Sequence, residues 1–498
     1  MLFNSIEFLV FLPLVLLGYF LLKGQRRYLL LFASYFFIGW WNWHYLGLIL
    51  VSTAIDYYAG RKLGELPIGA KGRKRFLWLS LSTNLGLLFF FKYFNFFNTE
   101  LDSVFHLLGL NYLVPYSDFL LPMGISFYTF QTLSYTIDIY YGKLQPEKDF
   151  KLFALFVSFF PQLVAGPIER ASHLIDQLRV HADLRWDNFK QGFTRVLFGL
   201  IKKLVIADRL ALFVNPIYND VTSFDGFMLS IATLFFAFQI YCDFSGYSDI
   251  AIGIARMFGV DLMENFRSPY LSKDIREFWS RWHISLSTWF RDYVYIPLGG
   301  NRTGQSKFYR NIMIVFLVSG FWHGANWTFI IWGGIHGVFL LLGMRYQNLK
   351  SRFFPKPNAP KLLASFEVGF TFLVVCFAWI FFRANSLADA FFVVEHLMHV
   401  DMSFVSDVVY QLKSVLFDPS NAANRFNLDF GRINLQSSIG DFWLSLIFIP
   451  SLLLFEFHWP KGIAFKGDNA TFLAWFISIV FIMLFGVFTQ NQFIYFQF

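Results

Sequence analysis

The sequence predicts an all-α integral membrane protein of about ten to twelve transmembrane helices, with additional re-entrant and amphipathic surface helices. Three observations predict this class. Of the 498 residues, 56% are hydrophobic and only 15% are charged, whereas about a quarter are charged in an average soluble domain. Sixty-nine are phenylalanine, more than one water-soluble core would bury. Long apolar stretches also recur along the chain, and about 20 residues are enough to cross the hydrocarbon of a bilayer.

The apolar stretches define the predicted elements in order. They lie near 6–22, 28–58, 77–97, 120–141, 151–165, 193–214, 228–258, 312–345, 364–382, 441–457 and 470–490. The first lacks a basic n-region and a small-residue cleavage site, so we expect a spanning helix rather than a removable signal. The second is too long for one straight helix and is predicted to be a bent pair. The stretch 151–165 is short enough to be re-entrant, which requires burial in protein or a cavity lining.

One membrane domain, residues 1–498, is predicted, because the sequence shows no fixed-period repeat and no low-complexity tract. Its polar residues gather at about 120–345, which we take as the catalytic core. The segment at about 385–440 is nearly neutral in charge. It is predicted to be a loop or surface-helix region that faces outward.

Composition also excludes several functions. Cys242 and Cys376 both lie inside apolar runs, so neither a disulfide framework nor a cysteine metal site is expected. The formal charge of +8 does not indicate nucleic-acid binding, because the bases cluster in short loops, such as 61–75, where they set membrane topology. The sequence contains no nucleotide-binding loop, zinc signature or serine-nucleophile elbow.

The least lipid-like part is residues 266–310, with eight bases against three acids. Such a patch suits an anionic donor or a phospholipid head group, although a solvated surface helix would show the same pattern. On one continuous helix, Arg281, Ser285 and Asp292 would share a charged stripe. His283 would then point to the opposite, inward side, either as a buried core histidine or as a functional group.

Two further histidines, His323 and His336, interrupt a stretch that is otherwise apolar enough to span. Ionisable groups at membrane depth are costly and usually mark a water path or a reaction site. On one regular helix the two imidazoles would lie about 220° apart. His323 stands at the expected break beside Gly324 and is the favoured candidate, with a purely structural role equally open.

A third polar group contains Asp243, Tyr247 and Asp249, again inside an apolar run. Its carboxylates could form a proton route in a transporter, a hydrogen-bonding scaffold beside a reaction chamber, or helix caps at a bend around Ser245. The scaffold is favoured, because buried carboxylates need partners. A similar polar break containing Glu169 is expected to shape a cavity wall.

The imidazole side chains of histidine are the reactive groups that remain as candidates, and their chemistry suits acyl transfer. A neutral ring can take the proton of a hydroxyl that attacks a thioester, or it can carry the acyl group briefly itself. An apolar setting favours the neutral form.

Several long strings support a family resemblance. QLVAGPIER, YCDFSGYSDIAIGIARMFG, NFRSPYLSKDIREFWSRWHISLSTWFRDYVYIPLGG, SGFWHGANWTFIIWGGIHG and the closing FIYFQF resemble the bacterial membrane-bound O-acyltransferases. Within that family the likeness is to the group of the alginate O-acetyltransferase membrane subunit and its peptidoglycan-acetylating relatives. It runs through most of the chain and is densest at about 120–340.

The resemblance implies helices around a central tunnel, with paired histidines at its narrow centre. Matched by motif, these are His283 in RWHISLS and His323 in FWHGA, the latter being the family's catalytic residue. The family would take an acetyl group from a cytoplasmic thioester such as acetyl-CoA. It would pass the group across the bacterial cytoplasmic membrane to a periplasmic or extracellular acyltransferase partner, which acetylates a polysaccharide. No metal and no permanently bound cofactor is implied.

The remaining site predictions concern substrate binding. Arg281 and Arg291 are expected to meet the phosphates of the donor. The other candidates, at the chamber wall or next to the histidines in sequence, are Asp243, Tyr247, Asp249, Trp282 and Asn326.

Two rival functions stay open. A proton-coupled transporter or channel would use Asp243, Asp249 and Glu169, and it would move substrate without consuming a thioester. An O-acyltransferase could instead modify peptidoglycan, teichoic acid or a lipid.

Overall fold

The computed structural model describes residues 1–117, 121–122, 124–163, 166–180, 183–302, 304–353, 361–399, 439–458, 467–488 and 493–494. Every regular element in these ranges is a helix, and no strand occurs in them. The predicted all-α class is therefore confirmed. Residues 400–438, most of the predicted loop or surface-helix segment, lie outside the described residues.

The chain divides into two compact units. The first comprises residues 1–199, 247–265 and 283–298, and the second comprises residues 200–246, 266–282 and 299–498. That the whole chain is a single domain stays a prediction. The longest helix, α12 (Gly226–Met257), contributes its first part to the second unit and its last part to the first.

Most helices of the first unit come from the N-terminal part of the chain. They are α1 (Ile6–Leu21), α2 (Arg26–Trp41), α3 (Leu46–Glu65), α4 (Arg73–Leu88), α5 (Phe94–Leu107), α6 (Ile125–Tyr140), α7 (Phe150–Ser158), α8 (Phe160–Leu163), α9 (Ala171–Arg179), α10 (Trp186–Leu200) and the later α14 (Ile284–Phe290). The second unit contains α11 (Asp208–Asn219), α13 (Ile275–Arg281), α15 (Gln305–His323), α16 (Trp327–Phe353), α17 (Lys361–Arg383), α18 (Leu387–His396), α20 (Ile439–His458) and α21 (Asp468–Phe485).

Six helical segments among the described residues are long and apolar enough to cross a membrane. They are Arg73–Leu107, Gly226–Met257, Trp327–Arg352, Leu362–Arg383, Asp441–His458 and Asp468–Phe485. The helices Ile6–Leu21 and Lys23–Trp41 pass the same test together but are bent by 107°. The number is below the predicted ten to twelve, because several apolar stretches form helices shorter than the roughly 20 residues that a straight span needs.

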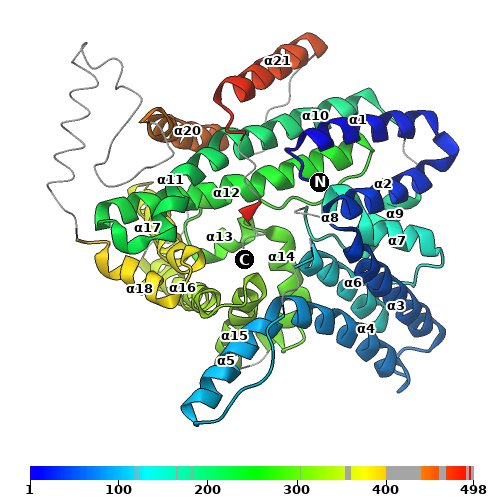
Figure 1. Cartoon of the computed structure of the whole chain (residues 1–498), viewed down its shortest axis with the longest axis horizontal. Coiled ribbons are helices and arrows are strands. Elements are labelled where there is room, and N and C mark those ends of the chain that lie inside the picture. The colour runs from blue at the N-terminus through cyan, green and yellow to red at the C-terminus, as the bar shows by residue number, and fades with distance from the viewer. Residues whose placement is uncertain are drawn as a thin grey trace. The chain divides into compact units, whose positions relative to one another are not determined.

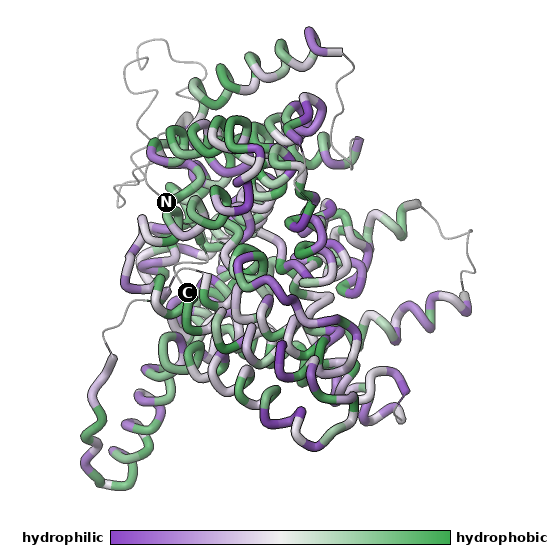
Figure 2. The backbone as a smooth tube through the Cα atoms, turned by 90° about the vertical axis from the view of Figure 1, so that its right-hand side faces the viewer, coloured by the Kyte–Doolittle hydropathy of each residue, from purple (hydrophilic) through white to green (hydrophobic). Residues whose placement is uncertain are grey.

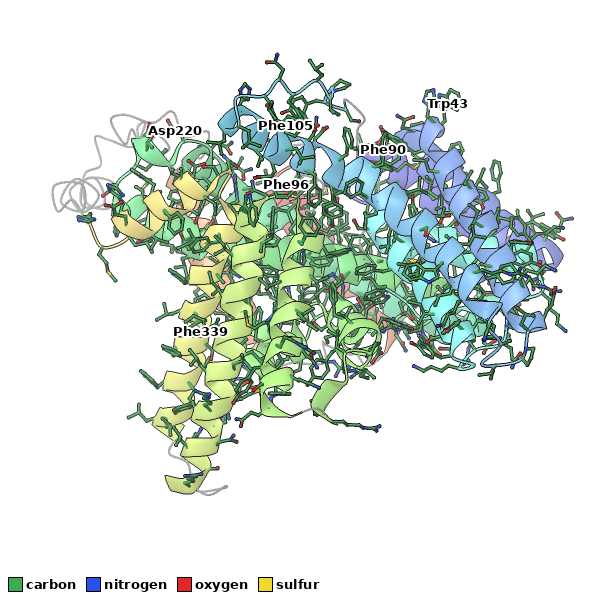
Figure 3. All side chains as sticks on the ribbon, turned by 90° about the horizontal axis from the view of Figure 1, so that it is seen from below. Trp43, Phe90, Phe96, Phe105, Asp220 and Phe339 are labelled. Carbon is green, nitrogen blue, oxygen red and sulfur yellow. The ribbon has the colours of Figure 1, made fainter. Side chains whose placement is uncertain are left out.

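These helices expose large apolar side chains on their outer surface. Leu473 is 60% exposed and Met483 is 71% exposed, both on α21. Figure 2 shows hydrophobic residues along the helices and hydrophilic residues gathered at several helix ends. Figure 3 shows Phe90, Phe96 and Phe105 along the segment Arg73–Leu107. Hydrocarbon must be the solvent of such side chains, and the chain is a multi-pass membrane protein.

The two awkward apolar stretches form short or bent elements. Residues 28–58 are divided between α2 and α3, with a short helical turn, Trp43–Tyr45, between them, so the predicted division of this stretch into a pair of helices is confirmed. Asn42 ends α2, and its side-chain oxygen accepts a hydrogen bond from the His44 amide at 3.0 Å. The stretch 151–165 forms the short helices α7 and α8. Whether this segment is re-entrant stays a prediction.

A buried polar cluster joins α3, α4 and α6, three helices of the first unit that lie side by side in Figure 1. Asp56 is fully buried and accepts hydrogen bonds from Ser80 Oγ at 2.5 Å and from Asn84 Nδ2 at 2.8 Å. Thr132 Oγ1 donates in turn to Asn84 Oδ1 at 3.3 Å. Because an unsatisfied polar group in hydrocarbon costs several kcal/mol, this cluster fixes how the three helices pack.

Glycines bring α15 and α16 close together in the second unit. Gly320 and Gly333 face each other so closely that a Cβ added to either would lie 3.3 Å from the Cα of the other. It would also collide with a main-chain carbonyl, that of Phe329 or Phe316. A further helix of the second unit, α17, packs beside α16 (Figures 1 and 3). This close packing holds the segment that carries His323 and His336.

Candidate active site

His323 is the last residue of α15, and the helix stops there because the backbone of Gly324 is extended, with φ −159° and ψ 149°. A side chain at Gly324 would collide with the ring of Phe329. The next helix, α16, begins at Trp327. The predicted break at His323 is therefore confirmed, and glycine is the residue that allows it.

Aromatic rings enclose the imidazole of His323, which is 2% exposed. The ring of Trp332 lies edge-on at 4.9 Å between centroids, and that of Phe382 lies edge-on at 5.5 Å. Trp322, the preceding residue, contacts the same ring at 4.9 Å. The imidazole thus sits in an aromatic setting rather than in a solvated loop.

His336 belongs to the same aromatic cluster. It is completely buried, and the ring of Phe278 stacks on it at 5.9 Å with an interplanar angle of 5°. Its Nδ1 accepts a hydrogen bond from Trp279 Nε1 at 3.3 Å. Trp332 contacts this imidazole at 5.0 Å as well. One tryptophan therefore contacts both histidines, although on a regular helix they would face different directions.

His283 lies in the first unit, between α13 and α14. The predicted continuous helix through Arg281 and Asp292 is wrong, because His283 has a left-handed backbone, with φ 42° and ψ 54°. That conformation costs a non-glycine residue about 1–2 kcal/mol, and such strain clusters at functional sites. The predicted inward orientation is confirmed, since His283 is fully buried.

Asn265 anchors this strained residue. Its Oδ1 lies 3.1 Å from His283 Nδ1 and accepts a hydrogen bond from Ser285 Oγ at 2.9 Å. Its main-chain carbonyl accepts from the amide of Ile284 at 2.9 Å. Because an amide oxygen can only accept, Nδ1 of His283 carries the proton and Nε2 keeps its lone pair. Burial lowers the pKa of His283 to about 3, so the ring is neutral at physiological pH.

The predicted donor-binding arginines already have carboxylate partners. Arg281 Nη2 lies 2.5 Å from Glu277 Oε1, one turn back on α13. Arg291 Nε lies 2.8 Å from Asp292 Oδ1, and its side chain is 60% exposed. These pairs are consistent with the solvated-surface alternative. That either arginine meets the donor's phosphates stays a prediction.

Trp282 and Asn326 have clear packing and capping contacts. Trp282 is 1% exposed and contacts the rings of Phe266 at 5.1 Å and Trp379 at 5.1 Å. Asn326 caps α16, because its Oδ1 accepts from the amide of Thr328 at 3.0 Å. Their substrate-binding roles stay predictions.

Asp243, Tyr247 and Asp249 lie within α12, which is continuous from Gly226 to Met257. The alternative of helix caps at a bend around Ser245 is therefore wrong. Asp243 belongs to the second unit, and its Oδ1 lies 2.6 Å from Lys203 Nζ. In the first unit, Asp249 pairs with Arg195 at 2.9 Å, and Tyr247 donates to Asn4 Oδ1 at 3.3 Å. These contacts support the scaffold interpretation.

Glu169, the third carboxylate of the transporter hypothesis, is also paired. Its Oε2 lies 2.8 Å from His173 Nδ1, and its Oε1 accepts from the amide of Met263 at 2.5 Å. Each carboxylate that the transporter would need thus has a specific structural contact.

Sequence reasoning missed the partners that hold these groups, namely Asn265, Arg195 and Lys203. Lys203 had a usable signal. It stands beside Lys202 in the middle of an apolar stretch, where ionisable residues are rare. The structure places both lysines in a π-helix, Ile201–Ala207, where they are buried. Among the described residues, no group of three histidine, cysteine or acidic side chains could hold a metal ion.

Known proteins resemble this chain along most of its length. The family model of the membrane-bound O-acyltransferases matches residues 147–388, a range that includes His283 and His323. The Probable alginate O-acetylase AlgI of Azotobacter vinelandii is 43% identical over 391 residues, covering 78% of this chain and 76% of that protein. The peptidoglycan O-acetyltransferase of Helicobacter pylori is 35% identical over 537 aligned residues, covering 100% and 98%. The teichoic acid D-alanyltransferase of Streptococcus thermophilus is 30% identical over 247 residues, covering 46% and 58%.

Proposed function

Because this chain belongs to the membrane-bound O-acyltransferase family, we propose that it transfers an acetyl group from cytoplasmic acetyl-CoA toward the hydroxyls of an exported polysaccharide such as alginate. That it is an O-acyltransferase follows from the family. The observation that carries the proposal is the position of His323. It stands at the break between two helices, and its imidazole contacts the aromatic rings of Trp332 and Phe382.

In the proposed step, His323 acts as a general base. One ring nitrogen takes the proton of the acceptor hydroxyl while its oxygen attacks the carbonyl carbon of the thioester. The new carbon–oxygen bond forms, the carbon–sulfur bond breaks, and the leaving thiolate takes the proton back from the imidazolium. In the alternative course, the ring nitrogen attacks first, carries the acetyl group briefly and passes it to the hydroxyl.

The other predicted residues support this chemistry in the proposal. Neutral His283, held by Asn265, orients the acceptor or accepts its hydrogen bond through Nε2. The ion pairs of Asp243 and Asp249 hold α12 rigidly, while Arg281 and Arg291 bind the phosphates of the donor.

The location and partner of the enzyme belong to the proposal. It would lie in the bacterial cytoplasmic membrane, surrounded by membrane lipids. The acceptor hydroxyl would belong to a periplasmic or extracellular acyltransferase, which passes the acetyl group to the glycan.

Peptidoglycan is the second candidate acceptor. It is favoured because the peptidoglycan O-acetyltransferase of Helicobacter pylori matches along nearly its whole length. Mass analysis of exported polysaccharide, cell-wall polymers and lipids from a deletion strain distinguishes the acceptors. Loss of acetyl groups from a single polymer identifies it, and loss from lipid alone would contradict both glycan proposals.

The catalytic assignment is tested with His323→Ala in membrane vesicles from the host strain, which retain partner and acceptor. We expect acetyl transfer and the release of free thiol from acetyl-CoA to fall to background, with normal amounts of inserted protein. His106→Ala is the matched control, because the side chain of His106 is 79% exposed on α5 and should not matter. Transfer at the wild-type rate in H323A would remove His323 from the mechanism.

The same vesicles test the transporter hypothesis. The enzyme releases thiol from acetyl-CoA without an ion gradient. A transporter would move substrate with no thioester consumed.

A further inference from the structure

Two buried N–H groups stand out in the aromatic cluster around His323. Neither His336 Nε2 nor Trp332 Nε1 has a hydrogen-bond partner in the part of the chain that the structure describes. His336 is 0% exposed and Trp332 is 1% exposed. Buried N–H groups are nearly always paired, so each exception calls for an explanation.

The protonated nitrogen of His336 is set by its neighbour. An indole N–H can only donate a hydrogen bond, and Trp279 Nε1 donates to His336 Nδ1 at 3.3 Å. In the neutral ring the proton must therefore sit on Nε2. His336 thus presents a fixed N–H donor, and not an acceptor, within the cluster.

Two other buried tryptophans, Trp379 and Trp289, donate a hydrogen bond from their indole N–H. In the same cluster, Trp379 Nε1 donates to the hydroxyl of Tyr270 at 3.2 Å. In the first unit, Trp289 Nε1 donates to the carbonyl of Phe130 at 2.9 Å. Trp332 differs from both in this respect.

The position of Trp332 connects the two donors to the proposed base. Its ring centroid lies 4.9 Å from that of His323 and 5.0 Å from that of His336. One donor is therefore carried by the ring packed against the imidazole that would activate the acceptor hydroxyl, and the other is carried by a histidine packed against the same indole.

We propose that His336 Nε2–H and Trp332 Nε1–H donate hydrogen bonds to the carbonyl oxygen of the acyl thioester. The inference rests on the proposed function and extends it to the stabilisation of the transition state. When the hydroxyl oxygen attacks, the π electrons of the carbonyl move onto its oxygen, which becomes negative. The two donors stabilise that charge until the carbon–sulfur bond breaks and the carbonyl re-forms. The same oxyanion forms if His323 carries the acetyl group first.

The test compares two variants of one type, Trp332→Phe and Trp379→Phe. Each keeps a large aromatic ring and removes one indole N–H, but only Trp379 loses an existing hydrogen bond. For W332F we expect kcat to fall about a hundredfold to a thousandfold, as when one oxyanion donor is removed. Its KM for acetyl-CoA and its Tm should stay close to wild type. For W379F we expect a lower Tm and a kcat within a few-fold of wild type.

A spectroscopic measurement reports on the carbonyl directly. Acetonyl-CoA, a ketone analogue of the donor, is labelled with ¹³C at its carbonyl and bound to the purified protein. Hydrogen bonds lower the infrared stretching frequency of that carbonyl in the wild type. In W332F, and in His336→Asn as the second variant, the frequency should shift back toward its value in an apolar solvent. W379F should leave it unchanged.

The outcomes separate this inference from the proposed function. If H323A keeps wild-type activity, the proposed catalytic role of His323 fails whatever W332F does. If H323A is inactive but W332F turns over at the wild-type rate, with the carbonyl stretch unmoved, the oxyanion assignment is overturned and the proposed function stands. Equal losses of kcat and Tm in W332F and W379F would also overturn it, because packing alone would then explain both. Should W332F fail to fold, His336→Asn decides the matter by the same measurements.

Discussion

Removal of the buried cation at Lys203 should destabilise the second unit strongly. Its ammonium lies 2.9 Å from Asp208 Oδ1 and 2.6 Å from Asp243 Oδ1, and all three side chains are at most 4% exposed. Breaking one buried ion pair by deleting a partner costs about 3–5 kcal/mol, since a buried charge loses its compensation. Lys203→Met keeps an unbranched side chain only one atom shorter and removes a cation shared by two carboxylates. We therefore expect the free energy of unfolding to fall by at least about 3 kcal/mol.

The assay is reversible unfolding in mixed detergent micelles, followed by tryptophan fluorescence. The matched control is Lys62→Met, which breaks the pair with Glu65 at 2.7 Å, a pair whose side chains are 38% and 53% exposed. Solvent already screens that pair, so little change is expected. The double variant K203M/D243N removes one charge of each sign and should recover part of the loss. If K203M is no less stable than K62M, the buried network does not hold the fold.

The remaining predictions concern His283 and the contact between α15 and α16. Burial lowers the pKa of His283 to about 3, below its usual 6.5, so the unfolded chain binds its proton first as the pH falls. The stability this group contributes is present above about pH 6.5 and decreases by up to about 1.4 kcal/mol per pH unit below it. His283→Gln should therefore flatten the decline of Tm between pH 7 and pH 5; an equally steep decline would contradict the buried neutral ring. Gly320→Ala should cost about 1–3 kcal/mol by overpacking against the carbonyl of Phe329. Gly343→Ala, on α16 with nothing within 4 Å of its Cβ position, is the control, and equal Tm values for the two variants would refute the close approach.

The family resemblance read from the sequence is confirmed, because long strings of side chains carried it rather than one short motif. The helix break at His323 was also predicted from the sequence, because a polar residue beside Gly324 interrupts an apolar stretch. The catalytic role of His323 stays a prediction. The sequence prediction of a continuous helix through His283 was wrong. It assumed one helix from Arg281 to Asp292, whereas the buried Asn265, which is distant in sequence, holds His283 in a left-handed conformation.

Composition and hydropathy alone determined that this chain is helical and lies in a membrane. Each long apolar stretch requires hydrocarbon around it, and a backbone in hydrocarbon satisfies its own polar groups by forming a helix. The partners of its buried polar groups could not be read in the same way. Lys203 meets Asp243 across 40 positions of sequence, and Trp332 on α16 contacts both His323 on α15 and His336 on its own helix. Those contacts depend on how helices pack, and helix packing is decided by side-chain shapes from distant segments together. Periodicity along one segment carries no record of them.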